Sequence, residues 1–377
     1  MNGEARDYFL ADDLSGALDA AAAFHHAGRR VRIALSLEAW AGAGRGEVVG
    51  FTTETRNEPP GAAAAAVARA IAFGHARGER LVFKKIDSTL RGPVAAELAA
   101  LTATLPDARI LFTPANPHVG RTVRDGVLLV HGIPVAQTDF ARDPASPVTE
   151  SSIRALLGEA ATPRVSIVDA SQEADLEAAV EQMRSTGGPW VAVGSGALAR
   201  PVANVRAGAR LKPVPGSARI PPGGVLLVGG SAHRANRVQV EQLAQAAGLS
   251  ICEVRVGEPD AAVNPALEGL RRDGGVILQL ESARTESGRA RGAMTHAAEL
   301  VIRRSGVARI FATGGETAFA ICRALEFRSL LFREELEAGL SVSEVEAGGR
   351  RFALAIKPGG FGDAGAWTRA WHALRAV

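Results

Sequence analysis

The chain has 377 residues, 43 of them basic and 40 acidic, and its formal net charge is +3. This length is large for one core, so two domains are expected. Basic residues are interleaved with acidic ones and form no long run, and the chain has a single tyrosine. These features exclude an extended nucleic-acid surface and indicate small anions as partners.

No apolar run approaches the length of a membrane span, and no signal peptide is recognisable. We therefore expect no membrane partner and a cytoplasmic location. The two cysteines, Cys252 and Cys322, each lie in an apolar segment and suggest neither a disulfide framework nor a metal site.

The first half of the chain alternates short apolar runs with alanine-rich helical stretches, which is typical of βα units in a largely parallel sheet. Strands are expected near 7–11, 31–35, 48–52, 81–84, 109–113, 165–169 and 190–194. Helices are expected near 15–27, 61–77, 93–104, 171–186 and 196–204. In "DGVLLVHGIPV" two apolar runs flank His131-Gly132, which predicts a hairpin. This hairpin, near 127–135, is a plausible contact surface for a possible homodimer.

A stretch without acidic residues, 182–240, contains the proline- and glycine-rich segment "GARLKPVPGSARIPPGG". That composition is typical of a linker, so we place the domain boundary at about 206–222. The expected domains are 1–208 and 222–377. Beyond the linker the βα pattern resumes, so the predicted fold class is α/β, with two domains that each contain a largely parallel sheet flanked by helices.

Two adjacent carboxylates, Asp12 and Asp13, stand where the first strand ends and the first helix begins. Ligands of open α/β sheets bind outside the carboxyl ends of strands. A carboxylate pair there can accept a hydroxyl proton or hold a cation. Helix capping is the simpler alternative, and it accounts for one aspartate better than for two.

The segment "LVFKKIDSTLRGP", residues 81–93, holds two of only four lysines in the chain. Its strand ends just before a loop that brings together four polar residues: Lys85, Asp87, Ser88 and Arg91. A point charge, a planar guanidinium fork and a hydroxyl form a suitable receptor for a small hydroxylated carboxylate. The alternative is an ion pair between Asp87 and a neighbouring cation. Lys84 is expected on the other side of the strand, in a structural ion pair.

The loop "TPANPHVGRTVRDG" is long for a βα connection, and long ordered loops are often functional. Its polar candidates are Asn116, His118 and Arg121. A lone histidine is more often a hydrogen-bonding residue than a catalyst. Arg121 is the preferred candidate, as a second contact for an anion.

Three glycine-rich turns follow three expected strands in the second half: Gly229-Gly230-Ser231, Gly314-Gly315-Glu316-Thr317 and Gly359-Gly360-Phe361-Gly362. Such turns expose backbone N–H groups at helix N-termini, where phosphate binds. No lysine follows a glycine, which excludes a Walker A loop. The run Gly194 to Ala199 has the glycine spacing of a dinucleotide site but lacks the later acidic residue, so it is interpreted as a tight packing turn.

Six segments resemble, in order and spacing, the four-carbon acid sugar kinases, a family once catalogued as a domain of unknown function. They are "ADDLSGALD", "KKIDSTLRG", "PANPHVGRTVRDGVLLVHGIPVAQTDFARDP", "GSGALA", "TGGETA" and "KPGGFGD". The resemblance spans nearly the whole chain. It implies an ATP- and Mg²⁺-dependent kinase that phosphorylates the terminal hydroxyl of threonate, erythronate or 3-oxo-tetronate, with the active site in the interdomain cleft.

The resemblance also implies which residues bind each substrate. The sugar-acid side would hold Asp12, Asp13, Asp87, Ser88 and Arg91, and the ATP side Ser231, Gly314, Gly315, Glu316, Thr317, Gly359 and Gly360. Arg91, with Lys85 or Arg121, would bind the sugar carboxylate, and Asp12 or Asp13 would accept or orient the hydroxyl proton. The alternatives are a hydroxy-acid lyase or dehydrogenase, and a non-catalytic sensor of sugar acid or nucleotide.

Overall fold

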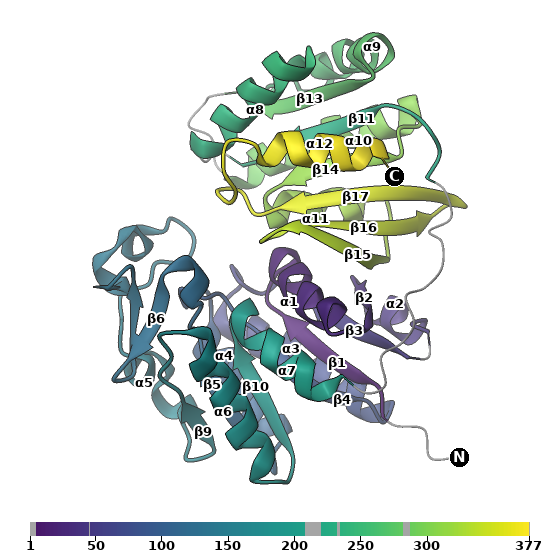
Figure 1. The fold of residues 1–377 in the computed structure, drawn as a ribbon. Coiled ribbons are helices and arrows are strands. Elements are labelled where there is room, and N and C mark those ends of the chain that lie inside the picture. Colours follow the sequence, from purple (N-terminus) through teal and green to yellow (C-terminus); the bar gives the residue numbers. More distant parts are fainter. Residues whose placement is uncertain (1–4, 45, 208–219, 232–233, 282–286, 377) are drawn as a thin grey trace. The chain divides into compact units, whose positions relative to one another are not determined.

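The computed structural model describes residues 5–44, 46–207, 220–231, 234–281 and 287–376. The chain divides into two compact units, residues 1–213 and 214–377, which are described separately below. Figure 1 shows their helices and strands.

The first unit is built on a parallel sheet of seven strands among its described residues. In spatial order these are β2 (Arg30–Ala34), β3 (Glu47–Thr52), β1 (Asp7–Ala11), β4 (Arg80–Lys85), β10 (Trp190–Gly194), β5 (Arg109–Thr113) and β9 (Val165–Ile167). Every neighbouring pair is parallel. The central strand β1 is buried along its whole length, as expected for a parallel sheet covered on both faces.

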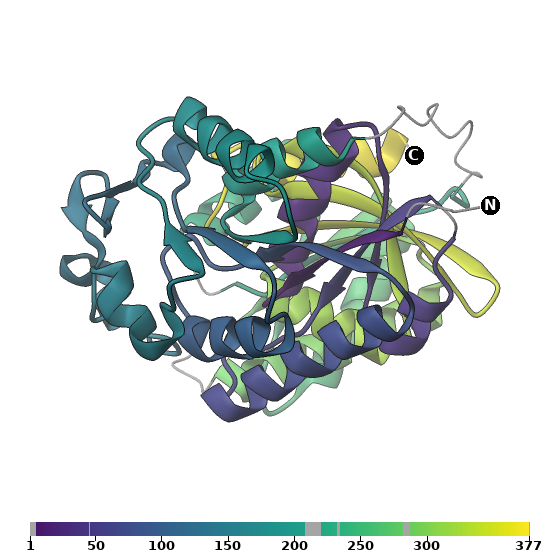
Figure 2. The same cartoon turned by 90° about the horizontal axis from the view of Figure 1, so that it is seen from below.

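Helices cover both faces of this sheet. On one face α1 (Leu14–His26), α6 (Glu173–Ser185) and α7 (Gly196–Arg206) pack side by side, and on the other α3 (Pro60–Ala76) packs against α4 (Val94–Thr104). Figure 2 shows the two helix layers above and below the strands. Two shorter helices, α2 (Leu37–Ala41) and α5 (Ile153–Leu157), lie outside these layers.

A small antiparallel sheet extends from the loop after β5. It consists of β6 (Arg121–Arg124), β7 (Val127–Val130) and β8 (Ile133–Pro134). His131-Gly132 form the predicted two-residue turn between β7 and β8, and both residues have positive φ. The following segment forms the 3-10 helices η2 (Val135–Gln137) and η3 (Asp139–Arg142).

The second unit contains another seven strands within its described residues. Their order is β12 (Ser250–Val254), β13 (Gly275–Leu280), β11 (Val225–Gly229), β14 (Arg309–Thr313), β17 (Arg350–Lys357), β16 (Leu340–Ala347) and β15 (Ser329–Glu337). Strand β16 pairs antiparallel with both of its neighbours, and the other pairs are parallel.

The helices of the second unit form two groups. Helices α8 (Arg234–Ala247) and α12 (Ala366–Ala376) pack together, and α9 (Val263–Asp273), α10 (Ser287–Ser305) and α11 (Gly315–Ala324) form the second group. Figure 1 shows α12 in front of β14, with α11 behind the strands.

The predicted fold class is confirmed, because each unit contains a largely parallel sheet flanked by helices. Each expected strand and helix of the first unit has its counterpart within a few residues. The expected strand at 165–169 is shorter, since Ala170 already pairs with Val123 of the small sheet. The β15–β16 hairpin was missed, although its alternating polar and apolar residues flank a turn at Gly339.

Candidate active site

The carboxyl ends of β1, β3 and β4, which are adjacent strands, gather most of the predicted polar residues of the first unit. Asp13 is the N-cap of α1, because its carboxylate accepts a hydrogen bond from the backbone N–H of Gly16 at 2.7 Å. Capping therefore accounts for Asp13, whereas Asp12 does not cap this helix. Both carboxylates are buried.

Arg56, which the sequence analysis missed, binds both carboxylates. Its guanidinium donates to the Oδ1 and Oδ2 atoms of Asp12 at 2.8 and 2.9 Å, and to those of Asp13 at 2.9 and 2.6 Å. Its loop is fixed to the end of β1, since the backbone N–H groups of Thr55 and Arg56 both donate to the carbonyl of Asp12. The pairing of β1 with β3 thus delivers the arginine to the carboxylate pair.

The two carboxylates differ in proton affinity. Burial acts to raise the pKa of Asp12, but Arg56, Lys84 and Lys85 outweigh it, so the net shift is downward. Burial and the neighbouring charge of Asp12 raise the pKa of Asp13, despite the opposing effect of Arg56. The surrounding cations thus favour the ionised form of Asp12, and the negative charge of Asp12 favours a proton on Asp13.

The loop after β4 places Asp87 and Arg91 beside this pair. The carboxylate of Asp87 accepts from the backbone N–H of Thr89 at 2.8 Å and from Nη2 of Arg91 at 2.7 Å. Its Oδ2 also lies 3.9 Å from Arg56. Burial opposes ionisation of Asp87, but the two arginines hold its pKa well below the usual range. The turn is strained at Leu90, a non-glycine residue with φ of 63°.

The two adjacent lysines point to different partners. Lys84 forms a buried ion pair with Glu97 at 2.8 Å, which confirms the expected structural role. Lys85 lies 3.5 Å from Asp19 and donates to the carbonyl of Ile86 at 3.1 Å. Only Lys85 therefore lies with its ammonium toward the start of α1.

Arg121 reaches the same loop from the small sheet. Its Nη1 donates to the hydroxyl of Ser88, and its guanidinium carbon lies 5.5 Å from the ring centroid of Phe140. No carboxylate of the described residues forms an ion pair with Arg121. Burial lowers its pKa, and the charges of Asp87 and Asp19 only partly offset this. Within the described ranges, Arg121 is thus a half-buried cation without a directly paired carboxylate.

The remaining residues of the long loop have other roles. The backbone N–H groups of Asn116 and Arg121 donate to each other's carbonyls, which closes the loop, and His118 is exposed. The turn at Gly194 is a packing turn as expected, since a Cβ there would lie 2.2 Å from the carbonyl of Thr113. A Cβ at Gly196 would meet the Asp19 carboxylate at 2.1 Å.

Glu54, in the same loop as Arg56, carries a second missed feature. Its backbone has φ of 51°, and its carboxyl accepts from the Thr52 hydroxyl at 2.5 Å. Burial, with added repulsion from Asp13 and Asp12, raises the pKa of Glu54 to about 8. Glu54 therefore keeps its proton at neutral pH.

The Glu54→Gln variant tests this protonation. The unfolded chain releases this proton near pH 4.5 and the folded chain near 8. Glu54 therefore costs stability progressively as pH rises between these values, and the cost persists above them. We expect Glu54→Gln to match the wild type at pH 4.5 and to exceed its free energy of unfolding by up to about 5 kcal/mol at pH 8.5. Thermal midpoints across this range measure the difference. The exposed Glu181→Gln is the control, and a pH-independent difference for Glu54→Gln contradicts the assignment.

In the second unit, the three glycine turns follow strands that are neighbours in the sheet. The strands β11, β14 and β17 are in register, so their last residues, Gly229, Thr313 and Lys357, lie side by side at one edge of the sheet. A Cβ at Gly230 would lie 2.5 Å from Thr317, and a Cβ at Gly359 would lie 2.3 Å from the hydroxyl of Ser231.

The three glycine turns lie close together and form one cluster, called the cradle below. It is lined by their backbone and by the hydroxyl groups of Ser231 and Thr317. Helix α11 begins beside it with Gly314 as N-cap, which has no side chain to bond the first N–H groups. The residues present therefore fit a triphosphate chain, because phosphate binds to backbone N–H groups at a helix N-terminus.

Lys357 organises the third turn and does not extend toward solvent. It is buried, and its ammonium donates to the carbonyls of Pro358, Gly359 and Phe361 at 3.1, 3.1 and 2.7 Å. Burial lowers its pKa to about 8. Its position under the turn indicates that it holds the loop that contains Gly359 and Gly360.

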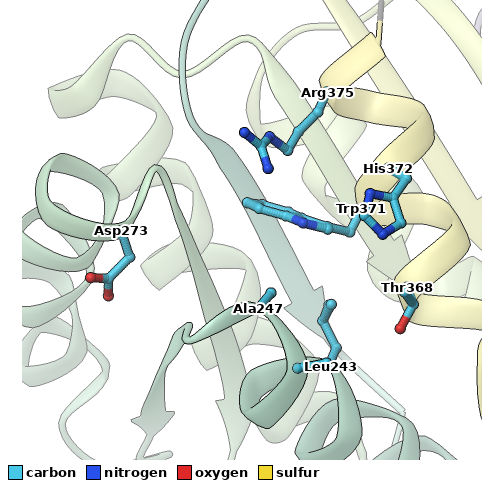
Figure 3. Close-up of a pocket in the computed structure, with 8 residues that line it drawn as sticks. Leu243, Ala247, Asp273, Thr368, Trp371, His372 and Arg375 are labelled. Carbon is cyan, nitrogen blue, oxygen red and sulfur yellow. The ribbon is translucent and has the colours of Figure 1, made fainter.

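A pocket of about 240 Å³ lies elsewhere in the second unit (Figure 3). It is lined by Leu243, Ala246, Ala247, Asp273, Thr368, Trp371, His372 and Arg375. Gly275, the first residue of β13, packs directly against Trp371. The pocket is therefore at the amino ends of the strands, and the glycine turns are at their carboxyl ends.

The described residues contain neither a candidate membrane-spanning helix nor a candidate metal cluster. No helix there is both long and apolar enough to cross a membrane. No group of three or more His, Cys, Asp or Glu side chains in the described ranges is arranged to hold a metal ion.

Comparison with known proteins assigns a class to each unit. The family described as a sugar-binding N-terminal domain matches residues 8–166, and the family described as a nucleotide-binding C-terminal domain matches residues 226–366. The fold and the sites thus define a protein with one sugar-binding and one nucleotide-binding domain.

Named relatives narrow the class. A D-threonate kinase from Bordetella bronchiseptica is 33% identical, with 97% of this chain and 96% of the relative covered. A 3-oxo-tetronate kinase from Pseudomonas fluorescens is 27% identical, with coverages of 96% and 95%. The chain therefore belongs to the four-carbon acid sugar kinase family, whose members are phosphotransferases and use ATP.

Solved structures agree with this fold. A protein from Salmonella typhimurium, described as a putative tRNA synthase, superposes with a TM-score of 0.78 at 23% identity and covers 97% of this chain and 98% of its own. A Bordetella bronchiseptica protein of 32% identity has a TM-score of 0.51, with 99% of each chain covered. It is described as a domain-swapped dimer with bound citrate.

Proposed function

We propose that this protein uses ATP to phosphorylate the terminal hydroxyl of a four-carbon acid sugar of the threonate, erythronate or 3-oxo-tetronate type. The observation that carries the proposal is Arg121, a cation that no carboxylate of the described residues pairs with. It lies beside the loop of Asp87 and Arg91, and Arg56 connects Asp87 to the carboxylates of Asp12 and Asp13. Such a site offers one position for a carboxylate and one for a hydroxyl.

Two further observations support the acid as substrate. The similarity to named D-threonate kinases extends over almost the whole chain. The citrate in the Bordetella bronchiseptica structure is itself a hydroxy acid, so a relative of similar sequence binds this class of molecule.

In the proposed mechanism Arg121, assisted by Arg91 or Lys85, binds the sugar carboxylate. Arg91 is already paired with Asp87 and Asp143, so its main role is to orient the sugar carboxylate. Ser88 and Asp87, in the same loop as Arg91, are the proposed contacts for the hydroxyl groups of the substrate. Fixing the acid at one end leaves its terminal hydroxyl at a defined place, which is the main requirement of phosphoryl transfer.

Asp13 is the proposed acceptor of the proton that leaves the terminal hydroxyl. Asp12, with the lower pKa, stays ionised and holds Arg56 in place. The γ-phosphorus gains a bond to the sugar oxygen and loses its bond to the bridging oxygen of ADP, and the hydroxyl proton passes to the carboxylate.

The cradle of glycine turns is the proposed ATP site. The N–H groups of Gly314, Gly315, Glu316, Gly359 and Gly360 and the hydroxyls of Ser231 and Thr317 would contact the phosphates. Mg²⁺ at such a site requires few protein ligands, because phosphate oxygens and water supply the rest. When bound, Mg²⁺ would neutralise charge on the phosphates, with the hydroxyls of Ser231 and Thr317 as candidate ligands.

The dehydrogenase alternative lacks support. The glycine turn that resembles a dinucleotide site faces the carboxylate of Asp19, which would repel a pyrophosphate.

The domain-swapped dimer of the Bordetella bronchiseptica protein supports a homodimer for this chain. Ile133, half exposed on the hairpin near 127–135, is compatible with that contact surface.

The experiment is an ADP-release assay against a panel of four-carbon acids of every configuration. We expect ADP and a phosphate ester with at least one acid, little ADP without acid, and loss of activity when EDTA removes the divalent cation. Reduction of NAD by an acid would favour a dehydrogenase, and acid cleavage without ATP would favour a lyase. Thermal stabilisation by ligands without any turnover would favour a sensor.

A further inference from the structure

We propose that Phe140 is a positioning residue of the sugar-acid site, whose ring holds Arg121 and Arg91 where they can bind the substrate carboxylate. This inference rests on the proposed function. The guanidinium carbons of Arg121 and Arg91 lie 5.5 and 5.6 Å from the ring centroid of Phe140. Both distances are within the range of a cation–π interaction.

The backbone of Phe140 is fixed on both sides. Its N–H donates to the Thr138 hydroxyl at 3.4 Å, and its carbonyl accepts from the N–H of Val148 at 3.0 Å. Farther along the same loop, the hydroxyl of Ser146 donates to the carbonyl of Arg56 at 3.3 Å. The loop is thus attached to the segment that carries Arg56, and the ring has a defined position.

An aromatic ring orders a cation without neutralising its charge. A carboxylate partner would use the guanidinium N–H groups, as Asp12 and Asp13 do with Arg56. The face of a ring attracts the cation through its quadrupole and leaves the N–H groups in the guanidinium plane available. Arg121 donates a hydrogen bond to Ser88, and no carboxylate of the described residues pairs with it.

Two neighbouring arginines repel each other when no anion is bound. The charge of Arg91 lowers the pKa of Arg121, which reflects this repulsion. Nε of Arg91 is also buried and has no hydrogen-bond partner in the described part of the chain. Asp87 and Asp143 hold Arg91 from one side, Ser88 accepts one hydrogen bond from Arg121, and the Phe140 ring contacts both cations and so fixes them relative to each other.

Loss of the Phe140 ring should weaken the binding of only one of the two substrates, the sugar acid. Without the ring the arginines must be ordered when the acid binds, and the lost side-chain entropy weakens binding of the acid. The residues of the proposed ATP site all belong to the second unit, so the KM for ATP serves as the internal comparison.

The test compares Phe140→Leu with Phe140→Tyr. Leucine fills a similar volume without a ring, and tyrosine retains the ring. We expect Phe140→Leu to raise the KM for the sugar acid about tenfold, with kcat and the KM for ATP within about twofold of wild type. Phe140→Tyr should stay within about twofold for all three constants.

Phe73→Leu is the matched control. Phe73 is also half buried, in the same unit, with the guanidinium carbon of Arg77 5.6 Å from its ring, but it lies on α3. We expect it to leave the KM for the acid unchanged.

Three outcomes would overturn the inference. The first is an unchanged KM for the acid in Phe140→Leu. The second is an equal rise in the KM for ATP. The third is the same defect in Phe140→Tyr, which would indicate packing alone.

Failure of the proposed function is distinguishable. If the wild type phosphorylates no four-carbon acid, calorimetric titration with citrate in the absence of ATP still compares Phe140→Leu with wild type. Weaker citrate binding in Phe140→Leu would support the positioning role, and equal binding would overturn it.

Discussion

Exchange of Asp13 for asparagine is expected to lower kcat by about 10²–10³, because asparagine cannot accept the hydroxyl proton. The fold should survive, since asparagine caps helices as well as aspartate does and the bond to the Gly16 N–H can remain. ATP affinity should change little. Steady-state kinetics, calorimetric ATP titration and the thermal midpoint together measure this outcome.

Two companion variants make the result specific. Asp7→Asn removes another buried, arginine-paired carboxylate from the opposite end of β1, where Arg80 is its partner at 2.7 Å. It should lose stability and keep its turnover. Asp12→Asn should also lose turnover, together with stability, because Arg56 loses a buried ionised partner. Near wild-type kcat in Asp13→Asn would show that Asp13 is not the base.

Exchange of Arg121 for alanine is expected to raise the KM for the sugar acid about 100-fold. Removal of a charge-assisted contact to a carboxylate costs about 2–3 kcal/mol, and Arg121 has no competing ion pair in the described residues to offset that loss. The KM for ATP should remain near that of wild type. Kinetics with each substrate varied in turn measure both constants.

Arg121→Lys tests whether the guanidinium fork matters as well as the charge. Lysine retains a point charge but cannot donate two parallel bonds, so an intermediate rise of about tenfold is expected. Arg124→Ala, an exposed arginine on the same strand, is the control and should behave as wild type. If Arg121→Ala binds the acid normally, another cation holds the carboxylate.

The sequence was most informative where local pattern determines structure. Alternation of apolar and helical segments predicted every strand of the first sheet, and parallel topology then implied that Asp12 and Asp87 lie at one edge. The three glycine turns were predicted for the same reason. Their contact, with Gly230 against Thr317 and Gly359 against Ser231, follows from strand order, which sequence alone did not provide.

The missed residues depend on contacts between distant segments. Arg56 lies more than 40 positions from Asp12, and nothing in "TTETRNEPP" marks it as an active-site residue until β3 is known to pair with β1. Phe140 is one aromatic residue in the short 3-10 helix η3, with no periodic pattern around it. The β15–β16 hairpin did carry a signal, since alternating residues flank Gly339.

The buried ion pair of Lys84 and Glu97 links the protein interior to the chemistry at the sheet edge. Their side chains are 1% and 2% exposed, so an exchange of either residue alone would leave a buried charge without a partner. Replacement of both residues by apolar side chains of similar volume is expected to raise the thermal midpoint of unfolding. That change would also remove a cation that lowers the pKa of Asp12. The pH optimum of the more stable double variant would therefore differ from that of the wild type.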